Sequence, residues 1–109
     1  MSQIVEITLQ NFDREVLQSD IPVLIDFWAP WCQPCIMMTP ALEELSEEFS
    51  GKLKIGKLNI EIDENRALAF RYQIQSIPNM KLFKNGQVIK EFIGLRPKEY
   101  FKAELEPEL

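Results

Sequence analysis

The sequence contains no histidine and only two cysteines among its 109 residues. A structural zinc site takes about four ligands, mostly thiolate and imidazole groups, so no zinc site within one chain is expected. A site that draws two cysteines from each of two chains stays open. The spacing between Cys32 and Cys35 must therefore decide what these residues do.

The sequence also lacks a long apolar run and an excess of basic residues. No stretch approaches the roughly 18 apolar residues that cross a bilayer. Residues 1–7 show no basic stretch followed by an apolar one, so no secretory signal is predicted. The formal net charge of −5 disfavours nucleic acid and anionic membrane surfaces as partners. We expect a cytoplasmic protein, and in such a reducing compartment paired cysteines are more often catalytic or metal-binding than structural.

The chain is too short for two ordinary domains, and it shows no repeat, low-complexity tract or linker. Its hydrophobic content is 46%, with seven Phe, two Trp and two Tyr. These side chains can fill one core without a disulfide or a structural metal. A single domain over residues 1–109, present as a monomer, is expected.

Hydrophobic periodicity predicts alternating strands and helices. The strands are expected at residues 5–9, 23–29, 53–60, 80–84 and 88–93. The helices are expected at residues 11–17, with Asn11 as the cap, and at residues 32–49, 63–72 and 97–106. This order predicts an α/β fold, with a mixed central sheet of about five strands flanked by four helices.

Each predicted helix has candidate core residues, and one connection has a clear turn signal. Asn85-Gly86 predicts a type I′ hairpin turn, which needs positive φ at both positions.

Pro40 lies inside the second helix and is expected to kink it. The residues expected to face the core are Phe12, Val16 and Leu17, then Met38, Leu42, Leu45 and Phe49, then Leu68 and Phe70, and finally Tyr100, Phe101 and Leu105.

Cys32 and Cys35 open a helix directly after a strand that is apolar on both faces. Their Cα atoms should be roughly 5 Å apart on a helix, which suits a disulfide. Unpaired N–H groups and the helix dipole at this end stabilise a thiolate, and Pro34 is tolerated in the first turn. A structural disulfide is disfavoured because so short a loop stabilises little. Two idle core cysteines remain possible.

The sequence resembles the thioredoxin family along nearly its whole length. A lone pair of cysteines at this spacing would be a modest signal, but many segments agree in register. These segments are residues 23–29 leading into Trp31-Cys32-Gln33-Pro34-Cys35, then Pro40, residues 57–60, Ile77-Pro78, residues 82–86 and Gly94.

The resemblance implies roles for the two cysteines. In the family the first cysteine attacks a substrate disulfide as the thiolate, and the second resolves the mixed disulfide; Cys32 and Cys35 match these positions. The helical period agrees with this order, because it puts Cys35 nearer the core and Cys32 nearer solvent.

Asp26 is a carboxylate in the middle of an otherwise apolar strand, where burial should raise its pKa. It resembles the family's buried acid, the general base that takes the proton of the second cysteine. Lys57 matches the residue that lies near that acid. The alternative is an Asp26–Lys57 pair with a purely structural role.

Pro78 resembles the family's cis-proline, which faces the cysteines and lets the adjoining backbone pair with an extended substrate. Trp28 resembles an aromatic residue packed beneath the site, although core filling explains it equally well. The resemblance implies a substrate-binding surface formed by Trp31, Gln33, Pro34, Ile77, Pro78 and Gly94.

The sequence departs from the family pattern at three positions. The family usually has Gly at Gln33, Lys at Ile36 and Thr at Asn79. Counting around the helix places Ile36 opposite the apolar stripe and beside Cys32, so it should be exposed and extend the substrate-binding surface. In the alternative, the bend at Pro40 tucks Ile36 into the core.

The resemblance implies a protein-disulfide reductase without a bound cofactor or metal. Its partners would be disulfide-containing proteins and thioredoxin reductase. An oxidant or isomerase of the same fold is a rival, but such enzymes usually carry His between the cysteines and a secretory signal. A binding module clamped on another protein is a rival from a different class.

Overall fold

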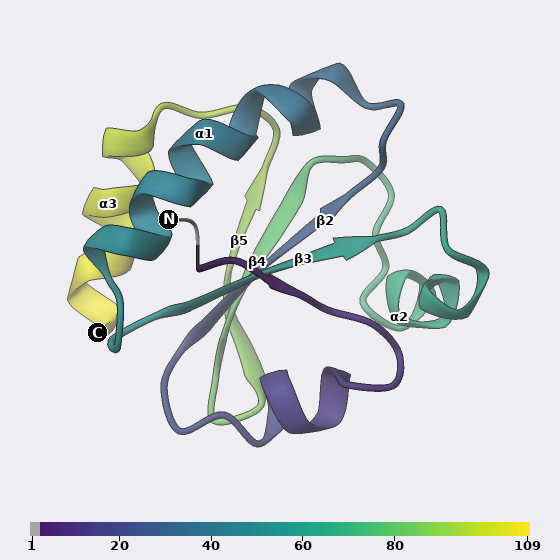
Figure 1. Ribbon diagram of the computed structural model, residues 1–109, viewed down its shortest axis with the longest axis horizontal. Coiled ribbons are helices and arrows are strands. Elements are labelled where there is room, and N and C mark those ends of the chain that lie inside the picture. Colours follow the sequence, from purple (N-terminus) through teal and green to yellow (C-terminus); the bar gives the residue numbers. More distant parts are fainter. Residues whose placement is uncertain (1–2) are drawn as a thin grey trace.

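A computed structural model describes residues 3–109 as a five-stranded mixed sheet with helices on both faces (Figure 1). The α/β prediction is confirmed. The strands are β1 (Val5–Glu6), β2 (Val23–Trp28), β3 (Lys54–Asn59), β4 (Asn79–Lys84) and β5 (Gln87–Ile93). The helices are η1 (Asp13–Leu17), α1 (Gln33–Glu48), α2 (Arg66–Arg71) and α3 (Lys98–Leu105), with short turns η2 (Asp63–Asn65) before α2 and η3 (Glu106–Glu108) after α3.

The strand order β1-β3-β2-β4-β5 puts β2 at the centre of the sheet. Strand β2 is parallel to β3 and antiparallel to β4. This explains why β2 is apolar at every position except Asp26, since both of its faces are covered. The register pairs Phe27 with Asn79, and Asn79 with Ile93, so three chain segments meet at the end of β2 that leads to Cys32.

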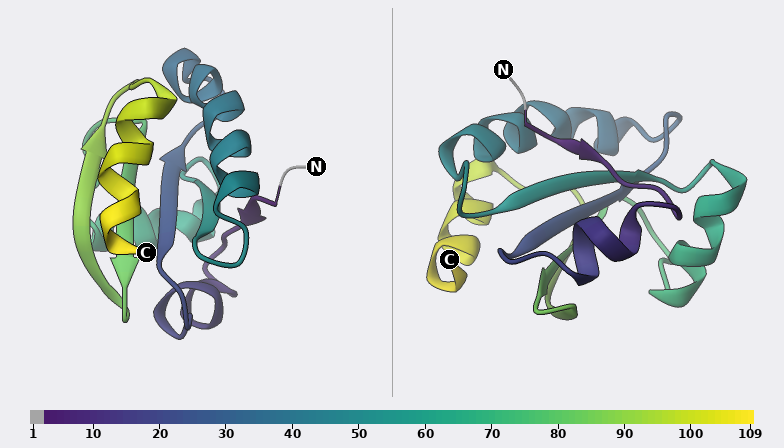
Figure 2. Two further views of the ribbon diagram at one scale, coloured as in Figure 1. Left: turned by 90° about the vertical axis from the view of Figure 1, so that its left-hand side faces the viewer. Right: turned by 60° about the horizontal axis from the view of Figure 1, so that its bottom comes forward.

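Two apolar clusters fill the two sides of the sheet. In Figure 2, right, α1 lies on one side of the sheet, while η1 and α2 lie on the other. The expected stripe of α1 is confirmed, because Met38, Leu42, Leu45 and Phe49 are all buried with Phe101 and Leu105 of α3. Among the helices of residues 3–109, none is long and apolar enough to cross a membrane.

The hairpin between β4 and β5 turns at Asn85 and Gly86. Their φ angles are 54° and 78°, so both lie in the left-handed region that a type I′ turn requires. The prediction from this dipeptide is therefore confirmed.

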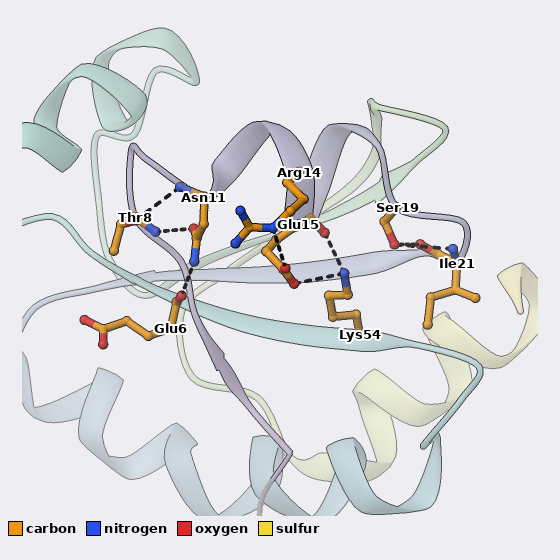
Figure 3. A network of polar contacts seen from close by, with 8 residues as sticks. All are labelled: Glu6, Thr8, Asn11, Arg14, Glu15, Ser19, Ile21 and Lys54. Atoms are coloured by element: carbon orange, nitrogen blue, oxygen red, sulfur yellow. Dashed lines mark hydrogen bonds and ion pairs between the residues drawn. The ribbon is translucent and has the colours of Figure 1, made fainter.

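Asn11 was expected to cap the first helix, and this prediction is wrong. Its side chain turns back toward β1: Oδ1 accepts from the Thr8 N–H at 2.7 Å, and Nδ2 donates to the Glu6 carbonyl at 2.8 Å (Figure 3). The side chain of Asn11 thus closes a turn, which is the other common use of asparagine.

Figure 3 also shows an ion pair between Glu15 of η1 and Lys54 of β3.

Two expected core residues are exposed. Phe70 was expected to anchor the third helix, but it is 88% exposed, because the short α2 buries only Leu68. Tyr100 was expected to face inward and is also exposed, although its ring packs against those of Phe92 and Phe101. In both helices the fully buried stripe is narrower than the periodicity suggested.

Gly56 of β3 lies under the side chain of Ile7, so we expect a larger residue at this position to destabilise the protein. A Cβ at Gly56 would sit 2.5 Å from Ile7 Cγ1 and 3.1 Å from Ile25 Cδ1. We expect Gly56→Ala to lower the free energy of unfolding by about 1–3 kcal/mol through overpacking, measured by urea denaturation. In the Ile7→Ala background the same change should cost much less. Alanine normally stabilises a strand relative to glycine, so a more stable Gly56→Ala protein would contradict this packing.

Candidate active site

A disulfide joins Cys32 and Cys35 at the start of α1, with the two Cα atoms 5.3 Å apart. Cys32 is the N-cap residue, and its Sγ accepts from the Cys35 N–H at 3.2 Å. Pro34 lies in the first turn, where no N–H is needed. A backbone donor and the positive end of the helix dipole thus both point at the sulfur of Cys32, an arrangement that favours its thiolate.

The two cysteine residues differ slightly in their exposure to solvent. Cys32 is 5% exposed and Cys35 is 0% exposed. They form a small cluster with Ala29, against which Trp28, Ile60 and Ile77 pack. Of the two cysteines, only Cys32 retains any exposure.

Asp26 is fully buried in β2, and neither carboxylate oxygen has a hydrogen-bond partner among residues 3–109. Its pKa is raised from 3.8 to about 7, because burial disfavours the charged form more than the nearby Lys57 favours it. It lies on the same face of the sheet as Leu24, which α1 covers. A carboxyl group near neutral pKa can both take and return a proton at physiological pH.

Lys57 is the register neighbour of Asp26 on the parallel strand β3. Its ammonium group, however, donates to Thr39 Oγ1 of α1 at 3.1 Å and lies 4.2 Å from the centroid of the Trp28 ring. It forms no hydrogen bond with Asp26 within the described residues. Lys57 therefore acts on the carboxyl group through its electric field, and a tight structural ion pair does not describe the arrangement.

The Ile77–Pro78 peptide bond is cis and directly precedes β4. The Gly94 N–H donates to the Pro78 carbonyl at 2.9 Å, which ties the end of β5 to this loop. Ile77 packs against the cysteine cluster. The loop, the end of β5 and the start of α1 are thereby brought together at one end of the sheet.

Exposed side chains surround this end of the sheet. Trp31 is exposed directly before Cys32, and Gln33 and Pro34 between the cysteines are exposed as well. Ile36 is 46% exposed, so the alternative in which Pro40 tucks it into the core is wrong. Helix α1 continues through Pro40. Met37, Ile93 and Leu95 are further exposed apolar residues on these segments.

Sequence reasoning missed two groups at the site. Met37 is exposed beside Ile36, and its position one residue before the buried Met38 could have placed it on the outer side of the helix. Thr39, the partner of Lys57, had no sequence signal, because the contact depends on how α1 lies across β3.

The described residues hold no group of three or more His, Cys, Asp or Glu side chains placed to bind a metal ion. The reactive group that the site presents is the Cys32–Cys35 disulfide.

A family model described as thioredoxin matches residues 3–107. The chain belongs to the thioredoxin family. It is 48% identical to a thioredoxin of Haemophilus influenzae over 98 residues, 90% of each chain. It is 44% identical to thioredoxin 1 of a Nostoc species over 109 residues, the full length of both. It is also 51% identical to a thioredoxin of Rickettsia felis over 92 residues, 84% of this chain and 86% of that one.

As a member of the thioredoxin family, the protein is a thiol-disulfide oxidoreductase and a protein-disulfide reductase. Its redox group is the Cys32–Cys35 disulfide, which is part of the chain, and thioredoxins need no cofactor. Family membership also implies disulfide substrates and a reductase in general.

The raised pKa of Asp26 predicts how stability depends on pH. Between about pH 4 and about pH 7 the folded protein keeps a proton that the unfolded chain has lost, so the free energy of unfolding falls as pH rises through this window. Replacing the carboxyl group should remove that loss. We expect oxidised Asp26→Asn to be more stable than the parent above about pH 7, by up to about 4 kcal/mol, with the gain fading toward pH 4.

Urea denaturation at a series of pH values measures this effect. The exposed Asp20→Asn is the matched control and should leave the shape of the pH curve unchanged. Parallel curves for the parent and Asp26→Asn would contradict a raised pKa at Asp26.

Proposed function

We propose that the protein reduces disulfides of other proteins, with Cys32 as the nucleophile and Cys35 as the resolving thiol. The observation that carries this proposal is the asymmetry at the start of α1. The Cys32 sulfur accepts a backbone hydrogen bond and the Cys32 residue retains some exposure, whereas Cys35 is completely buried. Only Cys32 combines access with thiolate stabilisation.

The first step starts from the reduced protein. The Cys32 thiolate attacks one sulfur of the substrate disulfide, so that a bond forms between Cys32 Sγ and that sulfur. The substrate's S–S bond breaks, and its second sulfur leaves as a thiolate that takes a proton from solvent. The product is a mixed disulfide between protein and substrate.

The second step needs a base, because Cys35 begins as a buried thiol. Asp26, in its ionised form, takes the Cys35 proton, directly or through water. The new thiolate attacks Cys32 Sγ, which closes the Cys32–Cys35 disulfide, breaks the mixed disulfide and releases the remaining substrate sulfur as a thiolate that is protonated from solvent, while Asp26 gives up the Cys35 proton to solvent. Two electrons have then moved from protein to substrate, and the two substrate thiols have taken up two protons. The near-neutral pKa of Asp26 supports this role, and the positive charge of Lys57 keeps the ionised form accessible.

The substrate segment binds in an extended form along the cis Ile77–Pro78 loop, next to the cysteine pair. The exposed apolar side chains at this end of the sheet support the proposal, because they favour a partner that buries them. Trp28 supports the site from below, where it packs against the cysteine cluster. The proposed binding surface comprises Trp31, Gln33, Pro34, Ile36, Ile77, Pro78 and Gly94.

A dithiol that donates electrons must be recharged, so the proposed second partner is thioredoxin reductase. The proposed compartment is the cytoplasm, where thiols are kept reduced. Both cysteines belong to one chain, so the proposed cycle runs on a monomer.

The cysteine variants test the proposed function. In an insulin turbidity assay driven by dithiothreitol, the parent should accelerate precipitation, and Cys32→Ser should be inactive. Cys35→Ser should accumulate mixed disulfides with insulin, because nothing resolves them. These adducts are measured by non-reducing mass spectrometry. A parent without acceleration would overturn the function, and adducts on Cys32→Ser in place of Cys35→Ser would reverse the two roles.

Because Ile36 is exposed beside Cys32, we expect it to influence both the Cys32 thiol and the choice of substrate. Ile36→Lys adds a positive charge near the thiolate and removes apolar area. It should lower the pKa of the reduced Cys32 thiol and weaken reduction of apolar substrate peptides relative to acidic ones, by about fivefold if about 1 kcal/mol of apolar contact is lost. Thiolate absorbance against pH and rates with two matched peptides measure both effects. If neither changes, Ile36 has no role in partner choice.

A further inference from the structure

A polar pocket of about 270 Å³ lies beside the start of β4, next to the proposed binding surface. Its lining comes from the segment before the cis-proline and from the paired strands β4 and β5. The residues are Gln73, Gln75, Ser76, Asn79, Glu91 and Ile93. This volume is smaller than the range of about 300–1,000 Å³ typical of small-molecule sites, and it suits a single side chain.

Asn79 supplies a buried acceptor that has no partner in the described part of the chain. The residue is 2% exposed, and its Nδ2 donates to Glu91 Oε2 at 3.3 Å. This bond fixes the orientation of the amide, because only the nitrogen can donate to a carboxylate. Asn79 Oδ1 is then left without a hydrogen bond from any residue in the range 3–109. Such an atom is unfavourable unless a donor reaches it.

Glu91 supplies a second acceptor on the same side of the pocket. Its Oε2 is engaged by Asn79 and by the ammonium group of Lys81, a residue that is itself buried. Its Oε1 receives no hydrogen bond from the described residues, and the side chain is about half exposed. Lys81 lowers the pKa of Glu91, so the carboxylate is charged at neutral pH.

The rest of the lining adds side chains that can both accept and donate hydrogen bonds. The side chains of Gln73, Gln75 and Ser76 have no hydrogen-bond partner within residues 3–109. The atoms that can only accept are Asn79 Oδ1 and Glu91 Oε1. A ligand that satisfies both must bring at least two donors, and a positive charge is favoured beside the ionised Glu91.

We propose that this pocket is a subsite for an arginine side chain of the protein substrate. A planar guanidinium group carries five N–H donors, enough to reach both Glu91 Oε1 and Asn79 Oδ1. A lysine ammonium is a compact point charge and matches two separated acceptors less well. The proposal rests on the proposed function, since it names a feature of the segment that this site would reduce.

The position of the pocket connects it to the disulfide. Ser76 directly precedes the cis Ile77–Pro78 bond, and Ile93 directly precedes Gly94, whose N–H binds the Pro78 carbonyl. Asn79 and Ile93 are register partners in the β4–β5 hairpin. A segment bound along Ile77 therefore passes the pocket within a few residues of its reacting cysteine.

Peptides with one cysteine in a mixed disulfide with a chromogenic thiol test the proposal. Arginine is placed in turn at each of several positions on either side of the cysteine, and each peptide has a twin with citrulline, which is neutral and similar in shape. The measurement is the second-order rate constant for reduction by the reduced protein. At one position we expect arginine to exceed citrulline by about tenfold, and to exceed lysine, as charge-assisted hydrogen bonds allow.

Three variants separate the pocket from general attraction between an acidic protein and a basic peptide. Asn79→Thr, and the double variant Lys81→Met with Glu91→Gln, should bring the arginine-to-citrulline ratio at that position close to one. The double variant removes the ion pair as a unit, so no buried lysine charge is left alone. Glu99→Gln, on the exposed side of α3, is the control and should keep the parent's ratio.

The outcomes distinguish a failure of the proposed function from a failure of the arginine subsite. If the parent reduces none of the peptides, the proposed function fails. If it reduces them but the ratio is the same at every position, or survives Asn79→Thr unchanged, the arginine subsite is overturned and the function stands. Because the ratio compares two peptides on one protein sample, a partly unfolded variant does not distort it.

Discussion

The burial of Asp26 constrains the whole site. A carboxyl group that has no hydrogen-bond partner among residues 3–109 lies in the central strand, covered by α1 on its own face and flanked by β3 and β4. Its ionisation is unfavourable there, so the two apolar clusters must supply the stability that offsets it. Because burial disfavours its charged form, the group has a pKa of about 7, which suits a base that acts on a buried thiol. Lys57 moderates this value from a distance, because its own hydrogen bond goes to Thr39.

The sheet register brings the other parts of the site to the same place. The antiparallel pairing of β4 with β2 and β5 sets the cis Ile77–Pro78 bond and Gly94 beside the end of β2 that leads to Cys32. The start of α1 then presents the Cys35 N–H to the Cys32 sulfur and keeps the Cys35 side chain buried. The proposed nucleophile, resolving thiol and binding surface therefore come from separate elements that meet at one end of the sheet, and the proposed base lies in β2, which leads to that end.

Local patterns in the sequence were enough to predict much of this arrangement. The cysteine spacing, the apolar run before it and Asn85-Gly86 act over a few residues, where backbone geometry leaves little choice. Long-range features could not be predicted in the same way. The Lys57–Thr39 contact depends on how α1 crosses β3, and the Asn79–Glu91 contact on the β4–β5 register. The prediction for Asn11 was wrong because an asparagine closes turns as readily as it caps helices. The prediction for Phe70 was wrong because a short helix buries few residues.

The central claim is that the buried carboxyl group of Asp26, in the strand that leads to the disulfide, has a near-neutral pKa. Carbon-13 NMR of the Asp26 side-chain carboxyl in the oxidised protein, followed from about pH 4 to about pH 10, tests it most directly. The account predicts a titration midpoint at about 7. A midpoint near the ordinary aspartate value of about 4 would contradict the account, because Asp26 would then be ionised throughout the working range and too weak a base for Cys35.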